Sequence, residues 1–112
     1  LWVCDTRNHR LQAFTLEGKH VRTVGGFGRG PGEFQRPCGI AFDGAGVLYV
    51  ADTGNQRVQK LDLEGKPLAA WGDFGPYPGF FSEPTGIAFH DGRVYVADRD
   101  NHRIQVFDAE GE

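Results

Sequence analysis

The chain has 112 residues, a length that predicts no more than one domain. Hydrophobic residues make up 39% and aromatic residues 12%, which provides apolar area to bury and argues against intrinsic disorder. No apolar run approaches the roughly 18 residues of a membrane-spanning helix, so no membrane insertion is expected, and the net charge of −3 is unlike that of a strongly basic nucleic-acid binder.

The charge is distributed unevenly along the chain. Residues 1–46 carry six basic and four acidic side chains (+2), whereas residues 47–112 carry six basic and eleven acidic ones (−5). A local basic patch is therefore compatible with the first part of the sequence.

An internal repeat dominates the sequence. Residues 1–42 align with residues 48–89 without a gap, at an offset of 47, with 22 identities in 42 positions. A third, partial copy begins at Val94, at an offset of 46 from the second. A fixed period of this size is typical of repeat architectures such as propellers and solenoids.

Each copy predicts short strands, which we assign to four positions, a to d. In the second copy, GIAF (39–42) predicts strand a, and the apolar run LYVAD (48–52) predicts a strand b that is buried on both faces. RVQKLDL (57–63) alternates partly and predicts a half-exposed strand c, and the turn residues 64–66 precede a strand d that ends at Trp71. No segment has a sustained 3.6-residue period, so no α-helix is expected.

Four short antiparallel strands per unit of this length indicate an all-β fold of β-propeller blades. In chain order the strands are b-c-d, then a-b-c-d, then a-b-c, which predicts an incomplete propeller of about two and a half blades. The predicted division is a blade part at 1–24, a full blade at 37–71 and a blade part at 84–108. The Gly- and Phe-rich stretches 25–36 and 72–83 would connect strand d of one blade to strand a of the next.

The residues that the three copies share, and the spacing between them, resemble those of the NHL repeat. The segments are DTRNHRLQAF (5–14), DTGNQRVQKL (52–61) and DRDNHRIQVF (98–107), each followed by a D/E-G turn; G-x-F-G, P-G-x-F and P-x-G-I-A-F follow the first two. The resemblance covers the whole chain, and NHR at 8–10 and 101–103 matches the Asn-His-Leu-type core that names the repeat. It implies a six-bladed ring, with the remaining blades of a longer protein as partners.

The two ends do not complement each other, because both supply strands b and c. Joining them would give surplus strands, and the chain alone would have unpaired sheet edges. The strand count therefore predicts a fragment of a longer propeller.

A triplet Asp-x-x-Asn-x-Arg recurs in every copy, and a structural role is expected for it because a catalytic site is usually unique in a chain. Asp could accept backbone N–H bonds in the turn between strands b and c, Asn could adopt the left-handed conformation there, and Arg could pair with Asp or contact the next blade. The residues are Asp5, Asn8, Arg10, Asp52, Asn55, Arg57, Asp98, Asn101 and Arg103.

Other features that could suggest chemistry have simpler explanations. GGFGRGPG (25–32) fits neither nucleotide-binding glycine motif, and no helix is predicted after it. Of the four histidines, only His90 follows an inner strand, near which a propeller could hold zinc. Cys4 and Cys38 are not in zinc-site spacing, and two small buried side chains are expected in preference to a disulfide. No catalytic residue, metal site or cofactor is predicted.

Alternating strand directions place the b–c turns and the d–a loops on one face of the blades. We expect this face to carry the candidate binding residues, which come from the segments where the copies differ most, as loops that carry function often do. These residues are Arg7, His9, Arg29, Phe34, Arg36, Gln56, Tyr77, Phe80, Arg99 and His102.

The predicted function is a non-enzymatic scaffold for macromolecular recognition through this face. The resemblance to NHL domains favours a protein partner, with single-stranded RNA as an alternative that the arginines beside an aromatic ring would suit. Two further alternatives are a structural spacer and a piece of a six-bladed propeller enzyme, such as a metal-dependent lyase, lactonase or other hydrolase, for which Asp43 and His90 are the nearest candidates. The sequence does not indicate a cellular compartment.

Overall fold

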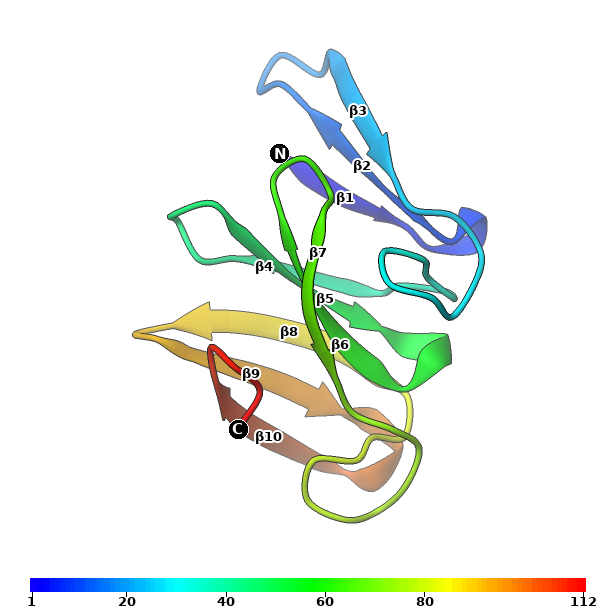
Figure 1. The fold of residues 1–112 in the computed structure, drawn as a ribbon, viewed down its shortest axis with the longest axis vertical. Coiled ribbons are helices and arrows are strands. Elements are labelled where there is room, and N and C mark those ends of the chain that lie inside the picture. The colour runs from blue at the N-terminus through cyan, green and yellow to red at the C-terminus, as the bar shows by residue number, and fades with distance from the viewer.

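The computed structural model describes residues 1–112 as three antiparallel sheets that lie side by side along the molecule (Figure 1). The first sheet has the order β1-β2-β3, the second β4-β5-β6-β7 and the third β10-β9-β8. The strands are β1 (Trp2–Asp5), β2 (Arg10–Phe14), β3 (His20–Val24), β4 (Gly39–Phe42), β5 (Val47–Asp52), β6 (Arg57–Asp62), β7 (Pro67–Trp71), β8 (Pro84–His90), β9 (Arg93–Asp98) and β10 (Arg103–Asp108).

This architecture confirms the predicted all-β fold of antiparallel propeller blades. The second sheet is a four-stranded blade with β4 to β7 at positions a to d, the first sheet provides positions b to d, and the third provides positions a to c. Strand b of the second blade is buried on both faces as predicted, since Leu48, Tyr49 and Val50 are all inaccessible.

Each b–c turn is a three-residue 3₁₀ helix, at Thr6–Asn8, Thr53–Asn55 and Arg99–Asn101. The residue after each helix, and not the Asn, adopts the left-handed conformation: its φ is 57° at His9, 56° at Gln56 and 54° at His102. The expectation for Asn was therefore wrong, because the asparagine closes the 3₁₀ turn and the next residue redirects the chain into strand c.

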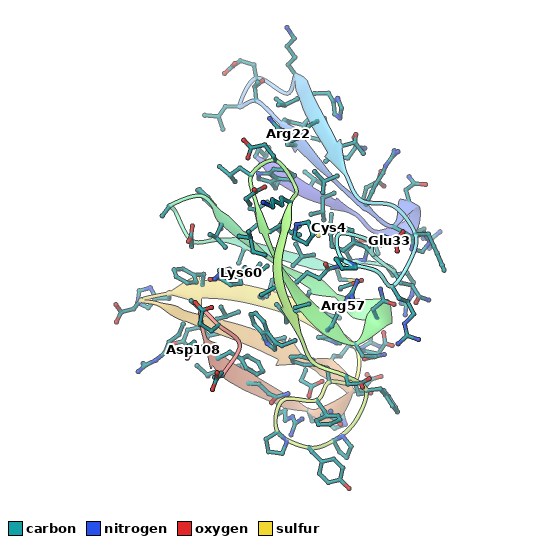
Figure 2. The ribbon with its side chains drawn as sticks, viewed as in Figure 1. Cys4, Arg22, Glu33, Arg57, Lys60 and Asp108 are labelled. Carbon is teal, nitrogen blue, oxygen red and sulfur yellow. The ribbon has the colours of Figure 1, made fainter.

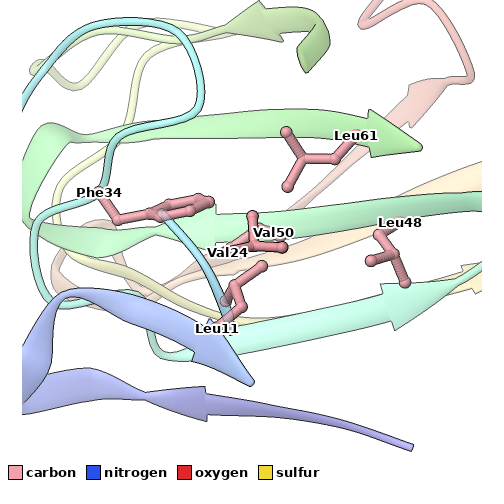
Figure 3. Close-up of a cluster of buried hydrophobic side chains, with 6 residues drawn as sticks. All are labelled: Leu11, Val24, Phe34, Leu48, Val50 and Leu61. Atoms are coloured by element: carbon pink, nitrogen blue, oxygen red, sulfur yellow. The ribbon is translucent and has the colours of Figure 1, made fainter. Parts of the chain in front are cut away.

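Two hydrophobic clusters lie between the sheets. The cluster between the first and second blades comprises Leu11, Val24, Phe34, Leu48, Val50 and Leu61 (Figure 3). The cluster between the second and third blades comprises Tyr49, Val58, Phe81, Val94, Val96 and Phe107. Burying each large side chain contributes about 1.5–3 kcal/mol, so the blades are held together mainly by these inter-sheet contacts.

The turn between strands c and d packs on the preceding blade where a glycine permits close approach. Gly65 has a φ of 91°, and a Cβ placed on it would lie 2.6 Å from the Val24 side chain in β3. Gly111 repeats this contact in the third blade, where a Cβ would lie 2.6 Å from the Trp71 ring. Strand d of one blade is thus covered by the c–d turn of the next.

Both cysteines are free thiols, but they differ in exposure. Cys4 in β1 is half-buried, whereas Cys38, just before β4, is exposed. The expectation of two buried side chains was therefore wrong for Cys38 and is met only in part by Cys4. The Cys38 thiol donates to the carbonyl of Arg36 at 3.3 Å in the loop that enters β4.

Candidate recognition face

The three b–c turns and the two d–a loops, here called the connectors (residues 25–36 and 72–83), lie on the same side of the molecule (Figure 1). The Gly54 amide donates to the Gln35 carbonyl at 2.7 Å, and the Asp100 amide donates to the Ser82 carbonyl at 2.9 Å. Each connector is thereby joined to the b–c turn of the blade that follows it. We call this surface the recognition face.

Four side chains in each blade form a repeated cluster, which we call a clamp. The first clamp is Asp5, Asn8, Arg10 and Gln12; the second is Asp52, Asn55, Arg57 and Gln59; the third is Asp98, Asn101, Arg103 and Gln105. In the second clamp, the Asp52 carboxylate accepts hydrogen bonds from Asn55 at 2.9 Å, Arg57 Nε at 2.7 Å and Gln59 at 3.2 Å. Its other oxygen accepts the Gln35 amide of the connector at 2.8 Å.

The second clamp holds the main chain of the first connector; Figure 2 labels Arg57 of the clamp and Glu33 of the connector. The Arg57 guanidinium donates to the carbonyl oxygens of Arg29 at 2.8 Å, Gly30 at 2.9 Å and Glu33 at 2.8 Å. These bonds orient the loop without using its side chains, so the tips of the connector remain free to vary.

Hydrogen bonds lower the pKa of the clamp carboxylates Asp5 and Asp98 and so favour their charged form. For Asp98, desolvation by burial would raise the pKa, but hydrogen bonds from the Ser82 amide, Asn101 and Arg103 outweigh it and lower the pKa. For Asp5, the Arg10 hydrogen bond is the largest cause of a lowered pKa. These ion pairs suit a structural role at neutral pH, where the carboxylates are ionised.

Nine of the ten candidate binding residues reach the surface. His9 and Gln56 are half-buried, and the exposed ones are Arg7, Arg29, Arg36, Tyr77, Phe80, Arg99 and His102. Phe34 is the exception, because it is fully buried in the first inter-blade cluster and cannot contact a partner. Its repeat counterpart Phe81 is buried in the same way in the second cluster.

Two exposed aromatic side chains were missed from the sequence. Phe27 is 61% exposed and Phe74 is 67% exposed, one in each connector. The Phe27 ring packs against the His9 ring with centroids 4.9 Å apart, and Tyr77 packs against Phe80 at 6.0 Å. The repeated G-x-F-G motif identifies both phenylalanines in the sequence, but it does not reveal that they point outward while Phe34 and Phe81 point inward.

Charge on the recognition face is partly neutralised. The Arg36 guanidinium lies 3.5 Å from the Glu83 carboxylate, and Arg99 lies 3.4 Å from Asp100. Arg7 and Arg29 take part in none of the ion pairs within the 112 residues. Glu33, in the same connector as Arg29, is exposed and likewise takes part in no ion pair, so both signs of unpaired charge occur near the first connector.

The connectors are also tied to the preceding blade's turn through polar side chains. The Arg36 amide donates to His9 Nδ1 at 3.0 Å, and the Glu83 amide donates to Gln56 Oε1 at 2.7 Å. His9 and Gln56 occupy equivalent positions, so the same contact uses an imidazole in one copy and an amide in the next. Both residues therefore have a structural contact in addition to the surface that they expose.

The remaining residues considered for chemistry lie apart from this face. No group of three or more His, Cys, Asp or Glu side chains in the chain is arranged to hold a metal ion. The Asp43 carboxylate accepts the Ala45 and Val47 amides at 2.7 and 3.0 Å and thereby closes the a–b turn, while His90 is exposed at the end of β8. None of the helices is long and apolar enough to cross a bilayer.

Comparison with known proteins identifies the repeats. The model of the family described as "NHL repeat" matches residues 34–61 and 81–107. A RING finger protein of Caenorhabditis elegans, nhl-1, is 46% identical over 39 residues, which amount to 35% of this chain and 4% of that protein. The chain thus spans only a small part of this curated relative.

Solved structures with a similar fold include enzymes and a binding protein. Hydrazine synthase of Kuenenia stuttgartiensis superposes with a TM-score of 0.74 at 17% identity, covering 96% of this chain and 29% of its own. An auxiliary nutrient binding protein of Bacteroides thetaiotaomicron has a TM-score of 0.68 at 14% identity, with 90% and 32% covered. A streptogramin B lyase structure has a TM-score of 0.60 at 16% identity, with 99% and 37% covered.

The structural likenesses establish the fold, and the sequence matches establish the repeat. Both matched segments run from the buried phenylalanine at the end of a connector through strands a and b into strand c. They therefore include Phe34 with the whole second clamp, and Phe81 with the whole third clamp. The chain therefore contains NHL repeats and forms part of a β-propeller.

Proposed function

We propose that this NHL module is a non-enzymatic scaffold that binds a macromolecular partner, in the first place a protein, through its recognition face. The observation that carries the proposal is the exposure of four aromatic rings on loops whose main chains are held by the clamps. The exposed rings are Phe27, Phe74, Tyr77 and Phe80. Aromatic residues and arginine are enriched in protein interfaces and in the residues that dominate binding energy.

The contrast between constant main chain and variable tips supports this proposal. In both connectors the clamp arginine donates to two equivalent carbonyls, those of Gly30 and Glu33 in the first and those of Tyr77 and Phe80 in the second. Yet Arg29 is replaced by Pro76 and Arg36 by Glu83 at equivalent positions. A rigid loop loses little conformational entropy on binding, which favours affinity. The arrangement suits a surface whose specificity is set by side chains and not by loop shape.

The experiment is a comparison of matched variants. The chain and a variant with Phe27→Ala, Phe74→Ala and Tyr77→Ala are immobilised, and the proteins retained from a cell extract are quantified by mass spectrometry. A control with Leu16→Ala, Val21→Ala and Leu68→Ala removes three exposed apolar side chains outside the recognition face. Proteins retained by the chain and the control but lost with the loop variant support the proposal; identical sets for all three contradict it.

Single-stranded RNA is the second candidate, favoured by the exposed Arg7 and Arg29 in the same turn and connector as the half-buried His9 and exposed Phe27 rings. Fluorescence anisotropy with a labelled single-stranded RNA at low salt tests it. Binding that weakens with added salt and with Arg7→Ala and Arg29→Ala would support an RNA-binding face, because phosphate contacts release counterions. The acidic balance of residues 47–112 makes a protein the first choice.

The enzyme alternative rests on the fold alone, which does not imply an activity. The likeness to a streptogramin B lyase structure is a likeness of this kind. Metal analysis together with lyase and lactone-hydrolysis assays would support this alternative if they gave bound metal and turnover that depended on Asp43 or His90. We also propose that these blades belong to a six-bladed ring, in which the further blades are partners of this chain. The proposed blade limits are 1–24, 37–71 and 84–108.

A further inference from the structure

The ring of His9 joins the first connector to the first b–c turn. Its Nδ1 accepts the Arg36 amide at 3.0 Å, at the end of the connector. Near the start of the connector, the Phe27 ring packs against the same imidazole with centroids 4.9 Å apart. One histidine side chain therefore contacts the connector near both of its ends.

The hydrogen bond from Arg36 requires a neutral imidazole. A main-chain N–H only donates, so Nδ1 of His9 must offer a lone pair and the ring proton must lie on Nε2. In a protonated imidazole both nitrogens carry a proton, and Nδ1 no longer accepts. Histidine is the side chain whose charge ordinarily changes between about pH 5 and pH 8, so mild acidification removes the acceptor of the Arg36 amide.

The second connector makes the same contact without a titratable ring. The Glu83 amide donates to Gln56 Oε1 at 2.7 Å, and Gln56 Nε2 donates to the Glu83 carboxylate at 3.1 Å. A glutamine side chain keeps its acceptor oxygen throughout this pH range. The chain therefore contains one pH-sensitive and one pH-insensitive version of the same main-chain contact.

The main chain of Arg36 is held in an unfavourable conformation. Its φ is 49°, in the left-handed region that residues with a side chain rarely adopt, and Glu83 repeats this with a φ of 58°. The amide of Arg36 is bonded to His9, and its carbonyl accepts the Cys38 thiol at 3.3 Å. Loss of the His9 acceptor removes one of these two hydrogen bonds and so favours relaxation of the strained residue.

The elements that pack against His9 carry charges of both signs. On the side of the b–c turn, Arg10 pairs with Asp5 at 2.8 Å, and Arg7 takes part in no ion pair. On the side of the connector, Arg36 pairs with Glu83 at 3.5 Å, Arg29 and Glu33 take part in no ion pair, and Cys38 contributes a thiol. No hydrogen bond or ion pair joins any of these carboxylates to the His9 ring, so a proton on the ring has no bonded counter-charge.

We infer that His9 is a pH-sensitive switch for the first connector. A proton from the solvent binds at Nδ1, breaks the hydrogen bond from Arg36 and releases the end of the connector, whereas Gln56 keeps the second connector in place. Because Phe27 packs on the same ring, the recognition face changes around the first connector and stays constant around the second. An effect on partner binding rests on the proposed function, whereas the release itself is measured on the chain alone.

Hydrogen exchange of main-chain amides tests the switch at the residue where it acts. The exchange rates of the Arg36 and Glu83 amides are measured by NMR at pH 7.5 and pH 5.5 and corrected for the intrinsic dependence of exchange on pH. We expect the protection of the Arg36 amide to fall at least about fivefold at pH 5.5, because it loses its only acceptor, and that of the Glu83 amide to stay constant.

Two variants provide matched controls for the exchange measurement. His9→Gln gives the first connector the side chain that the second one uses, so the Arg36 amide should stay protected at both pH values. His90→Gln removes an exposed histidine at the end of β8 and should leave the pH dependence of the Arg36 amide unchanged. Constant protection of Arg36 in the parent chain, or a pH dependence that persists with His9→Gln, would overturn the inference.

The retention experiment, repeated at both pH values, tests the consequence for binding. Proteins that the variant of Phe27, Phe74 and Tyr77 fails to retain should bind less to the parent chain at pH 5.5 than at pH 7.5, and His9→Gln should abolish this decrease. An equal decrease in the parent chain and the His9→Gln variant would overturn the regulation of binding. If the loop variant loses no protein at either pH, the proposed function fails, while exchange of the Arg36 amide still decides whether the switch exists.

Discussion

The first and second blades carry the same clamp in two environments. The Asp52–Arg57 pair is covered by a connector and by the adjacent sheet, with Asp52 inaccessible, whereas the Asp5–Arg10 pair is open to water. The distances within the pairs are almost equal, 2.7 and 2.8 Å. Equal geometry therefore does not mean equal energy, since removal of a partner leaves an uncompensated charge only where water is excluded.

The largest difference is expected when the carboxylates are removed. Asp52→Ala should lower the free energy of unfolding by about 3–5 kcal/mol, because it leaves Arg57 without its buried counter-charge and removes the acceptor of the Gln35 amide. Asp5→Ala should have a much smaller effect, since water can solvate Arg10. Chemical denaturation of both variants measures the difference. Equal losses would show that solvent exposure does not distinguish the two clamps.

The two phenylalanines of a connector provide the next contrast. Phe34→Ala should lower the free energy of unfolding by about 3–5 kcal/mol, because it opens a cavity in the cluster between the first two blades. Phe27→Ala should change it by less than about 0.5 kcal/mol, as expected for an exposed side chain. Denaturation midpoints compare the pair directly. A large effect of Phe27→Ala would show that this ring is buried in solution.

Substitution of two equivalent turn glycines distinguishes the effect of packing on stability from the effect of backbone strain. Gly65→Ala should lower the free energy of unfolding by about 1–3 kcal/mol more than Gly18→Ala, because only Gly65 lies against Val24. The two positions have similar φ values, so the cost of a side chain in a left-handed conformation should cancel. Thermal unfolding of both variants measures the difference. Equal losses would mean that strain alone accounts for both glycines.

Acid should weaken the third clamp. Hydrogen bonds lower the pKa of the buried Asp98 below its ordinary value of 3.8, so its contribution is present above about pH 4 and is lost as the pH falls toward the lowered pKa. Stability measured between pH 6 and pH 2 should therefore fall, and Asp98→Asn should reduce the slope. An unchanged slope in the variant would assign the acid sensitivity to other carboxylates.

The smallest expected effect is a difference in the rates at which the two cysteine thiols are alkylated, which is measured with the fold intact. Burial, with a smaller contribution from Cys38, raises the pKa of Cys4 from 9.0 to about 12, so Cys4 is almost entirely protonated at pH 8. Because the thiolate is the nucleophile, iodoacetamide should modify the exposed Cys38 first. Mass spectrometry of the digested chain gives the order. Equal rates in the native state would indicate that the edge of the first blade opens.

Much of the fold could be predicted because it depends on local pattern and repetition. The strand positions, the incomplete first and third blades and the role of the connectors follow from apolar runs, turn residues and the offset of 47 residues. The clamps were recognised only in part. The clamp glutamines, Gln12, Gln59 and Gln105, were missed because glutamine at a half-exposed strand position usually faces water, and only the neighbouring blade shows that Gln59 is buried.

The sequence by itself determined that this is a set of NHL-type propeller blades, because alternation and turn chemistry act over a few residues and the offset of 47 residues is visible when the copies are aligned. Only the tertiary structure decided which phenylalanine of a connector is core and which is surface. Phe27 and Phe34 are both conserved between the copies and lie seven positions apart, yet one is 61% exposed and the other 0%. Burial depends on the sheet that packs against the loop, and that contact is made by residues distant in the chain.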